Sequence, residues 1–455
     1  MSQTIKLKKG FTINLAGKAD KKIADSPQPE TFAIKPSDFP AISRPKLLVG
    51  EGDNVKAGTA LFYDKMVPDV MYTSPVSGEV AGIIRGEKRK VLELRILADK
   101  EVKYESFKTL SVSDISSASR EELQEAMVKS GVWPNLVQRP FGVVADPADT
   151  PKSIFISAFD THPLAPDYDF LFEGQEQNFQ AGLDALSKFT SGQIHVNVDN
   201  NAEVSPIFSH VRDVQINKFS GQHPAGNVGV QIHHLDPVNK GDIVWTINPY
   251  GVAQIGKLFL EGKYDASRRI ALTGSEVSNP QYYNTYTGAS INKFVDGNLK
   301  SEHVRFISGN VLTGERIAKD GYVGFYDNQV TVIPEGDYHE FMGWMKPTSA
   351  KLSYHRALGL LSFLNGSKKE YVLDSNARGE PRAFVQTGVF EDVTPMDILP
   401  TFLIKAIMAE DYDEMESLGL LEVVEEDLAL CEFVDVSKHN IQEIVRTGIN
   451  LLRTA

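Results

Sequence analysis

The sequence predicts a protein of several domains that combines α/β and α+β architecture, with a β domain first and helices last. Its 455 residues suffice for roughly three or four domains of ordinary size. Residues 1–104 show short apolar runs between turn residues and no helical period, which is typical of a small barrel or sandwich. Residues 153–247 alternate apolar strands with a helical stretch, and this order predicts a parallel sheet.

Composition and charge narrow the classes of function. With 42% hydrophobic and 24% charged residues, the chain has the composition of a packed globular protein. The formal charge of −13 argues against nucleic acid, whose phosphates attract basic surfaces. Residues 1–103 hold 18 basic and 13 acidic residues, so this part alone is positive. It could face an anionic partner or a membrane surface, although a solvated face explains the charge as well.

The chain also lacks the patterns of secreted and membrane-spanning proteins. No run approaches the ~18 apolar residues of a membrane span, and lysines occupy the start of the chain. The single cysteine, Cys431, excludes an internal disulfide framework and a metal site built on several thiolates. We therefore expect a soluble, cytoplasmic protein in which Cys431 is a small buried hydrophobe.

Short motifs in the first domain resemble those of biotinyl- and lipoyl-type domains. The motifs are Gly52-Asp-Asn-Val55, Asp64-Lys-Met66 and Ser74-Pro-Val-Ser-Gly-Glu-Val80. In such domains a lysine near the middle of an exposed hairpin carries the cofactor. Lys65 lies four residues after Leu61 but ten before Pro75, so we expect the hairpin apex nearer Pro68-Asp69. The resemblance implies a β barrel-sandwich at residues 1–104, and modification at Lys65 remains an alternative function.

Residues 105–262 predict a Rossmann-like domain, because strand, helix and strand follow one another at the spacing of a βαβ unit. A capping pattern at Ser119–Glu122 predicts the start of a helix that ends before Gly131. The other predicted elements are strands at 153–159, 193–198 and 242–247, and helices at about 175–189 and 251–261.

The remaining residues predict smaller units. Residues 263–319 indicate a small α+β module and 320–380 a β-rich segment with a turn at Pro334–Asp337. Residues 381–455 indicate a helical domain. There Ser437 is expected to cap a helix whose apolar residues share one face.

Motifs of cofactor binding and hydrolysis are missing. No Gly-x-Gly-x-x-Gly follows a strand, and neither a P-loop nor a Gly-x-Ser-x-Gly elbow occurs. The ten histidines are scattered. His233 and His234 lie in a predicted strand and would face opposite ways, which is poor geometry for chelation.

The whole chain resembles the A subunit of bacterial sodium-translocating NADH:quinone reductases, because several separated stretches occur in the family's order and spacing. These are Ile5–Phe11, Phe62–Lys65, Gly131–Trp133, Arg139–Phe141, Ala158–Ala165, Gln222–Gly226, Gly256–Leu260, Ser308–Gly314 and Glu425–Cys431.

The resemblance extends to the C subunit of Rnf complexes and to the flavin-binding subunit of respiratory complex I. It implies a degenerate Rossmann-like domain, a β-grasp-like module of SLBB type at 263–319, and lost cofactor sites. The counterpart of the flavin loop carries bulky residues and prolines where glycines must let backbone amides approach a phosphate. They are Trp133, Pro134, Leu136 and Pro140. With Cys431 as third ligand of a ferredoxin-like motif, the other positions hold Glu425, Leu428 and Asp435, which cannot bind an iron–sulfur cluster.

The resemblance therefore implies a cofactor-free, peripheral subunit on the cytoplasmic face of the inner membrane, soluble when isolated, with no catalytic residues of its own. It would be implicated in quinone binding and assembly, with flavins and iron–sulfur centres in partner subunits. Two Pro-adjacent histidines near the ligand-binding edge of the sheet, His162 and His223, are the candidate quinone-loop residues. The basic cluster Arg85, Lys88, Arg89 and Lys90 is the candidate docking contact. The alternative is a structural adaptor without quinone contact.

Overall fold

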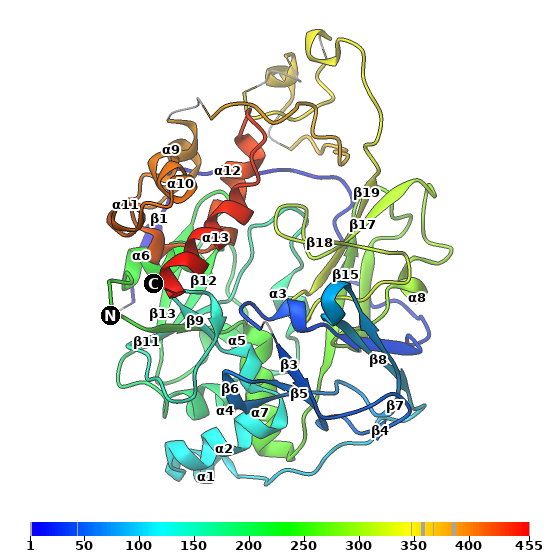
Figure 1. Cartoon of the computed structure of the whole chain (residues 1–455), viewed down its shortest axis with the longest axis vertical. Helices are drawn as coiled ribbons and strands as arrows, with labels where there is room; N and C mark the ends of the chain where they lie inside the picture. The colour runs from blue at the N-terminus through cyan, green and yellow to red at the C-terminus, as the bar shows by residue number, and fades with distance from the viewer. Residues whose placement is uncertain are drawn as a thin grey trace.

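The computed structural model describes residues 2–42, 44–346, 348–355, 360–366, 368–384 and 388–454. Within them the chain forms four β-sheets and a group of helices near the C-terminus (Figure 1). The prediction of a mixed α/β multidomain protein with a β domain first and helices last is confirmed. None of the helices in the described part of the chain is long and apolar enough to cross a membrane.

The first domain consists of two small antiparallel sheets around one core. The four-stranded sheet has the order β2-β8-β7-β4 and the three-stranded sheet the order β3-β5-β6. Within the three-stranded sheet the paired residues Phe62 and Tyr72 stack their rings, with the centroids 4.7 Å apart. The strands are β2 (Thr31–Ile34), β3 (Pro45–Leu47), β4 (Asn54–Val55), β5 (Ala60–Asp64), β6 (Val67–Thr73), β7 (Gly78–Arg85) and β8 (Val91–Ala98), with 3₁₀ turns η1 (Pro36–Asp38) and η2 (Glu87–Arg89).

The expected position of the hairpin apex at Pro68-Asp69 is wrong. Asp64 pairs with Val67, so Lys65 and Met66 are themselves the exposed turn between β5 and β6. The Met66 amide donates to Asp64 Oδ1 at 3.2 Å and closes this turn. Two register shifts in the pairing of β5 with β6 accommodate the extra residues on the longer side of the hairpin. The spacing in the sequence did not reveal these shifts.

The second domain contains a seven-stranded sheet of order β1-β13-β12-β11-β14-β9-β10. Its strands β1, β13, β12, β11 and β14 pair in parallel, as the βαβ spacing predicted, and β9 joins antiparallel. The edge strand β1 comes from the start of the chain, so the first residues cross over to complete this sheet. The strands are β1 (Thr4–Lys6), β9 (Val137–Arg139), β10 (Val143–Val144), β11 (Ser153–Ser157), β12 (Ile194–Asp199), β13 (Gln215–Ser220) and β14 (Val244–Thr246).

Helices cover this sheet. They are α1 (Val112–Ser117), α2 (Arg120–Ser130), α3 (Tyr168–Leu171), α4 (Glu176–Leu186), α5 (Pro206–Ser209), α6 (Val228–Leu235) and α7 (Pro249–Glu261), with η3 (Trp133–Asn135). Ser119 caps α2, and Gly131 ends it in the left-handed conformation, as predicted. The predicted strand at His233-His234 is wrong, because both residues lie at the end of α6. The short apolar run around these histidines fits a helix or a strand equally well. It forms a helix because α6 packs beside β11.

A third unit is a five-stranded sheet of order β16-β15-β19-β17-β18. Its central strand β19 comes from the segment predicted to be β-rich and pairs with both β15 and β17. The elements are β15 (Ser267–Thr273), β16 (Gln281–Tyr286), α8 (Asn292–Val295), β17 (Val304–Ser308), β18 (Glu315–Ile317) and β19 (Gln329–Pro334).

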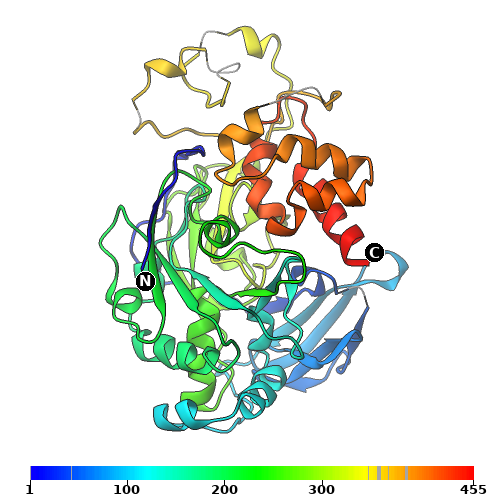
Figure 2. The same cartoon turned by 90° about the vertical axis from the view of Figure 1, so that its left-hand side faces the viewer.

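The chain ends in helices that pack on one another and on the α/β domain (Figure 2). These are α9 (Val389–Val393), α10 (Pro400–Met408), α11 (Tyr412–Ser417), α12 (Ala429–Val434) and α13 (Ile441–Thr454), with η6 (Leu420–Glu422) and η7 (Glu425–Leu428). The predicted cap at Ser437 is wrong: α13 begins four residues later, and the Ser437 hydroxyl donates to the Ala383 carbonyl at 3.2 Å.

Between β19 and α9 the chain leaves the body of the molecule. We call the described residues of 338–372 the arm. In both views the arm stands apart from the sheets, next to the C-terminal helices (Figures 1 and 2). Its regular structure is limited to the 3₁₀ turns η4 (Gly343–Met345) and η5 (Ser362–Leu364) in the residues that the structure describes.

Candidate functional site

A cleft of about 660 Å³ lies at the carboxyl ends of β11 and β12. This is the edge where open α/β sheets bind ligands, and the volume is that of a small-molecule site. The loop 158–169 after β11 forms one wall, and residues 198–208 after β12 form another. Residues 12–18 of the N-terminal segment and two residues of the arm, Lys368 and Glu370, complete it.

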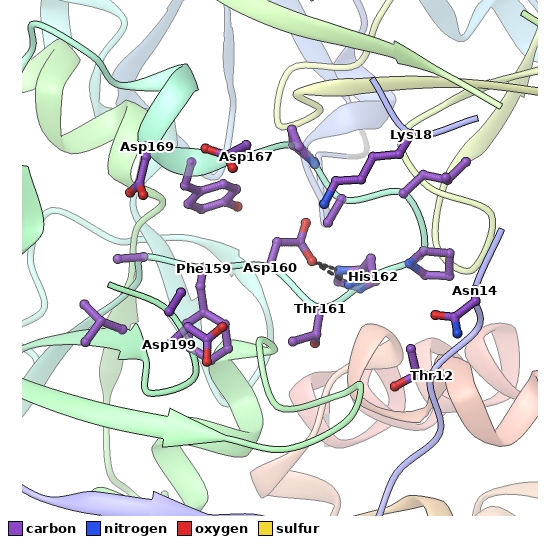
Figure 3. A pocket seen from close by; sticks show the side chains of 18 of the residues that line it. Thr12, Asn14, Lys18, Phe159, Asp160, Thr161, His162, Asp167, Asp169 and Asp199 are labelled. Carbon is purple, nitrogen blue, oxygen red and sulfur yellow. Dashed lines mark hydrogen bonds and ion pairs between the residues drawn. The ribbon is translucent and has the colours of Figure 1, made fainter. Parts of the chain in front are cut away.

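The lining combines apolar and charged side chains (Figure 3). Asp160 and His162 point toward each other, while Thr12, Asn14 and Lys18 lie on the N-terminal segment. The apolar lining includes Ile13, Leu15, Phe159, Pro163, Leu164, Pro166 and Phe208. The lining is also rich in charge, with six carboxylates against the two lysines Lys18 and Lys368: Asp160, Asp167, Asp169, Asp199, Glu203 and Glu370.

Asp160 and His162 form a tight pair within the loop after β11. The Asp160 Oδ1 accepts from the His162 backbone amide at 2.8 Å and lies 2.6 Å from the ring Nδ1. Burial alone would lower the pKa of His162, but the Asp160 carboxylate outweighs it and raises that pKa. Burial alone would likewise raise the pKa of Asp160, but the His162 ring prevails and lowers it. The two shifts both favour the imidazolium–carboxylate form of the pair.

His223 lies against this ion pair, so the structure brings together the two histidines singled out in the sequence. Their ring centroids are 4.5 Å apart. His223 Nδ1 lies 3.1 Å from the Thr161 hydroxyl. Burial and the neighbouring charge of His162 push the pKa of His223 well below its ordinary value, so this ring is neutral. Both Nε2 atoms are buried and have no hydrogen-bond partner among the described residues.

A buried charge network joins this site to the C-terminal helices. Arg139, the last residue of β9, donates to Asp427 Oδ2 at 2.9 Å and lies 3.4 Å from Glu426. The side chains of Arg139 and Asp427 are 4% and 0% exposed, so the pair is desolvated. The Glu426 side chain is 39% exposed. Its partial burial and the adjacent Asp427 charge raise its pKa to about 7, although Arg139 pulls in the opposite direction. Charges of Glu426 and Asp427 also favour the protonated His162.

The basic cluster predicted for docking lies elsewhere, at the tip of the β7–β8 hairpin. Arg85, Lys88, Arg89 and Lys90 are all exposed there. The Arg85 guanidinium donates to the Arg89 carbonyl at 3.2 Å. No ion pair found in the described part of the chain involves these four residues. Their charges therefore face solvent.

The residues expected to replace a flavin loop pack as core. Trp133 and Leu136 are fully buried, and the Trp133 indole donates to the Ala145 carbonyl at 2.8 Å. The Pro134 carbonyl accepts from the Tyr326 hydroxyl at 2.6 Å. Side chains thus fill the space that close backbone amides would need, and this stretch does not fit a flavin phosphate.

The positions of a ferredoxin-like motif do not fit an iron–sulfur cluster either. Glu425 pairs with Arg446, Leu428 is buried in the helical core, and Asp435 accepts from the His439 amide at 2.8 Å. Burial raises the pKa of the Cys431 thiol to about 12, so it is not a thiolate ligand. In the ranges that the structure describes, no group of three His, Cys, Asp or Glu side chains could hold a metal ion.

The described chain thus has a barrel-sandwich domain, an α/β domain with a cleft at its strand ends and a mixed five-stranded module, in this order. Three family models match these units in order. The NqrA N-terminal barrel-sandwich hybrid domain covers residues 5–99, the NqrA second alpha/beta domain 118–264, and the NQRA C-terminal domain 269–319.

Curated relatives match the chain over nearly its whole length. It is 38% identical to the A subunit of the Na(+)-translocating NADH-quinone reductase of Alcanivorax borkumensis over 98% of this chain and 99% of that one. The A subunits of Yersinia pestis and Rhodopirellula baltica are 37% identical, over 97% and 98% of this chain and 98% and 97% of theirs. The chain therefore belongs to the NqrA family, the A subunits of Na(+)-translocating NADH-quinone reductases, which confirms the resemblance seen in the sequence.

Solved structures add no detail to the site. A chain of the air-oxidized NAD+-reducing [NiFe]-hydrogenase covers 51% of this chain, and 52% of its own length is matched. Its TM-score is 0.33 and its identity 12%, and the H2-reduced form gives 0.37 and 10%. Likenesses this low place none of the residues discussed above.

Sequence reasoning missed two parts of the site. It did not connect Arg139 with Asp427, which are 288 positions apart, since no local pattern joins them. It also missed the walls formed by residues 12–18 and by the arm. A signal for the first part was present in the acidic run Glu425-Glu-Asp427, which interrupts an otherwise apolar stretch.

Proposed function

We propose that this chain is a peripheral subunit of a Na+-translocating NADH:quinone oxidoreductase and that it contacts quinone in the cleft at the ends of β11 and β12. The observation that carries the proposal is the full-length match to NqrA relatives together with a cleft lined by the Asp160–His162 pair. The chain would work on the cytoplasmic face of the membrane, in a complex that couples quinone reduction to Na+ export.

The cleft residues suit a quinone head group. Phe159, Pro163 and Leu164 offer apolar contact to a flat ring. A quinone carbonyl accepts hydrogen bonds, and the His162 Nε2, which is buried and has no partner among the described residues, would donate one if the ring turned toward the cleft. Its charge would also favour electron density on the carbonyl oxygen, while Asp160 fixes the ring orientation through Nδ1.

Electrons would travel through flavins and iron–sulfur centres in partner subunits, and the chain itself would sit chiefly against a membrane subunit. The packed stretch at Trp133–Leu136 and the buried Cys431 support a chain without redox cofactors. No electron-transfer step is therefore assigned to its own residues.

Co-purification tests this assignment. A tagged copy of the chain, isolated from native membranes in mild detergent, should bring down the other reductase subunits in fixed ratio. The chain made alone under cofactor-replete, anaerobic conditions should show only the aromatic absorption band. Stoichiometric flavin or iron–sulfur absorption would contradict the cofactor-free role, and failure to recover other subunits would contradict membership of the complex.

Two alternatives make different predictions. A purely structural adaptor would join the complex without saturable quinone binding. A carrier domain modified at Lys65 is favoured by one observation, the exposed position of Lys65 in the β5–β6 turn. Intact mass distinguishes it, because biotin or lipoate adds a fixed mass that a Lys65→Arg variant would lose.

A further inference from the structure

The arm concentrates exposed apolar side chains. Of the 19 large hydrophobic side chains exposed among the described residues, eight lie in the arm, which holds 29 of the 443 described positions. Phe341 is 87% exposed and Leu364 is 68% exposed. The others are Tyr338, Met342, Met345, Leu360, Phe363 and Val372. A concentration of this kind marks a contact surface for another molecule.

The charge of the arm is opposite to that of the whole chain. The described residues of the arm include four basic and two acidic residues, a net charge of +2, whereas the chain carries −13. The basic residues are Lys346, Lys351, Lys368 and Lys369, of which Lys346 and Lys351 pair with Glu340 inside the arm. Complementarity therefore favours a partner surface that is apolar at its centre and acidic at its rim.

The returning end of the arm forms part of the cleft. The Tyr371 amide donates to the Asn14 carbonyl at 2.8 Å, and the Ala16 amide donates to the Tyr371 carbonyl at 3.0 Å. Lys368 and Glu370, just before this ladder, line the cleft itself. A molecule that holds the arm therefore also acts on one wall of the cleft.

The backbone of the arm decides between a lipid and a protein partner. Two of its internal hydrogen bonds close short turns, from the Met345 amide to the Met342 carbonyl and from the Leu364 amide to the Leu361 carbonyl. A third joins the Leu361 amide to the Thr348 carbonyl at 3.1 Å. A backbone of this kind in hydrocarbon would leave amides and carbonyls without partners, at a cost of several kcal/mol for each group. A protein groove can supply those partners, and a bilayer interior cannot.

We propose that the arm is the element by which this chain docks into an apolar groove with an acidic rim on another protein of the complex. The inference rests on the proposed function, because it names the docking element of that assembly. It differs from the sequence-based prediction, which placed docking at the basic tip of the β7–β8 hairpin.

The test compares an arm variant with a matched control in the assembled complex. The variant is F341S/F363S/L364S, and the control is L48S/L97S, whose side chains are 49% and 46% exposed in the first domain. Each is co-expressed with the other subunits, and retention of the chain is measured over a dilution series. We expect at least tenfold weaker retention of the arm variant and unchanged retention of the control. Equal retention of both would overturn the inference.

Cross-linking keeps the test independent of any folding defect. A photo-reactive amino acid at Phe363 in the otherwise native chain should give an adduct with another protein of the complex, and the same group at Leu97 should not. An adduct with lipid or with a second copy of this chain would overturn the inference. The inference would also be overturned if the isolated wild-type chain bound phosphatidylglycerol vesicles and the arm variant did not. If the wild-type chain itself is not retained by the complex, the proposed function fails and this inference fails with it.

Discussion

Replacing Asp427 with Ala should loosen the C-terminal helices from the α/β domain. The substitution leaves the Arg139 guanidinium, 4% exposed, without its 2.9 Å partner. Removing one member of a buried ion pair costs about 3–5 kcal/mol, since the remaining charge is desolvated and unpaired. Glu426 remains 3.4 Å from Arg139 and partly replaces the lost charge, so we expect the lower end, about 3 kcal/mol.

Hydrogen–deuterium exchange measures this effect locally. A change of about 1.4 kcal/mol in the free energy of opening changes the exchange rate about tenfold. A loss of about 3 kcal/mol should therefore make the amides of α13 and η7 exchange roughly 100-fold faster, where exchange requires these helices to separate from the α/β domain. The amides of β7 and β8 in the first domain are the internal control. The double variant R139M/D427L replaces the pair with apolar groups and should restore slow exchange. An increase in exchange rate of less than about threefold in the Asp427→Ala variant would refute the reasoning. A double variant that exchanges as fast as the single variant would refute it as well.

Four further predictions follow from other parts of the structure. Gly131→Ala should lower the free energy of unfolding by about 2 kcal/mol or more, because Gly131 has φ +93° and an added Cβ would meet the Thr73 side chain. Urea titration measures this change, and an unchanged free energy of unfolding would contradict the prediction. Glu426 has a pKa of about 7 in the folded chain against an ordinary 4.5. Its contribution to stability is therefore present at low pH and is lost as the pH rises from 4.5 to 7. The Glu426→Gln variant should show a smaller fall in melting temperature between about pH 5 and 8, and a pH profile identical to that of the wild type would count against the assignment. Reversing the charges of Arg85, Lys88, Arg89 and Lys90 tests the docking site predicted from the sequence. If the tip of the β7–β8 hairpin takes part in docking, the salt-sensitive binding to the complex should weaken. Unchanged affinity at about 0.05 M and 0.3 M salt would exclude the hairpin tip as a docking contact. Lys65→Ala should leave mass homogeneity and complex activity unchanged, and loss of a discrete adduct together with activity would establish a carrier role instead.

The sequence could predict what local patterns determine. The short strands between turns of the first domain, the βαβ unit and the helix ended by Gly131 follow from spacing, capping and turn chemistry, and each is found. Errors arose where local patterns are ambiguous. His233 lies in a short apolar run that suits two periods, and the hairpin apex at Lys65 depends on bulges that leave no mark in composition.

The candidate site could be predicted only in part. Proline-adjacent histidines at the strand ends indicated His162 and His223, and the structure places their rings 4.5 Å apart. Their different protonation depends on burial and on charges brought from the C-terminal helices, which no local pattern records. The crossing of the first strand into the second sheet is likewise a long-range pairing, decided by tertiary structure.

Photoaffinity labelling with a quinone analogue tests the central claim most directly. The isolated chain is irradiated with a photo-reactive short-chain quinone, with and without excess unlabelled quinone, and the labelled peptides are identified by mass spectrometry. Quinone contact in the cleft predicts saturable labelling of residues 158–169 that unlabelled quinone suppresses and that His162→Ala reduces at least tenfold. Labelling that does not saturate, or that falls only on surfaces outside the cleft, would contradict quinone contact there.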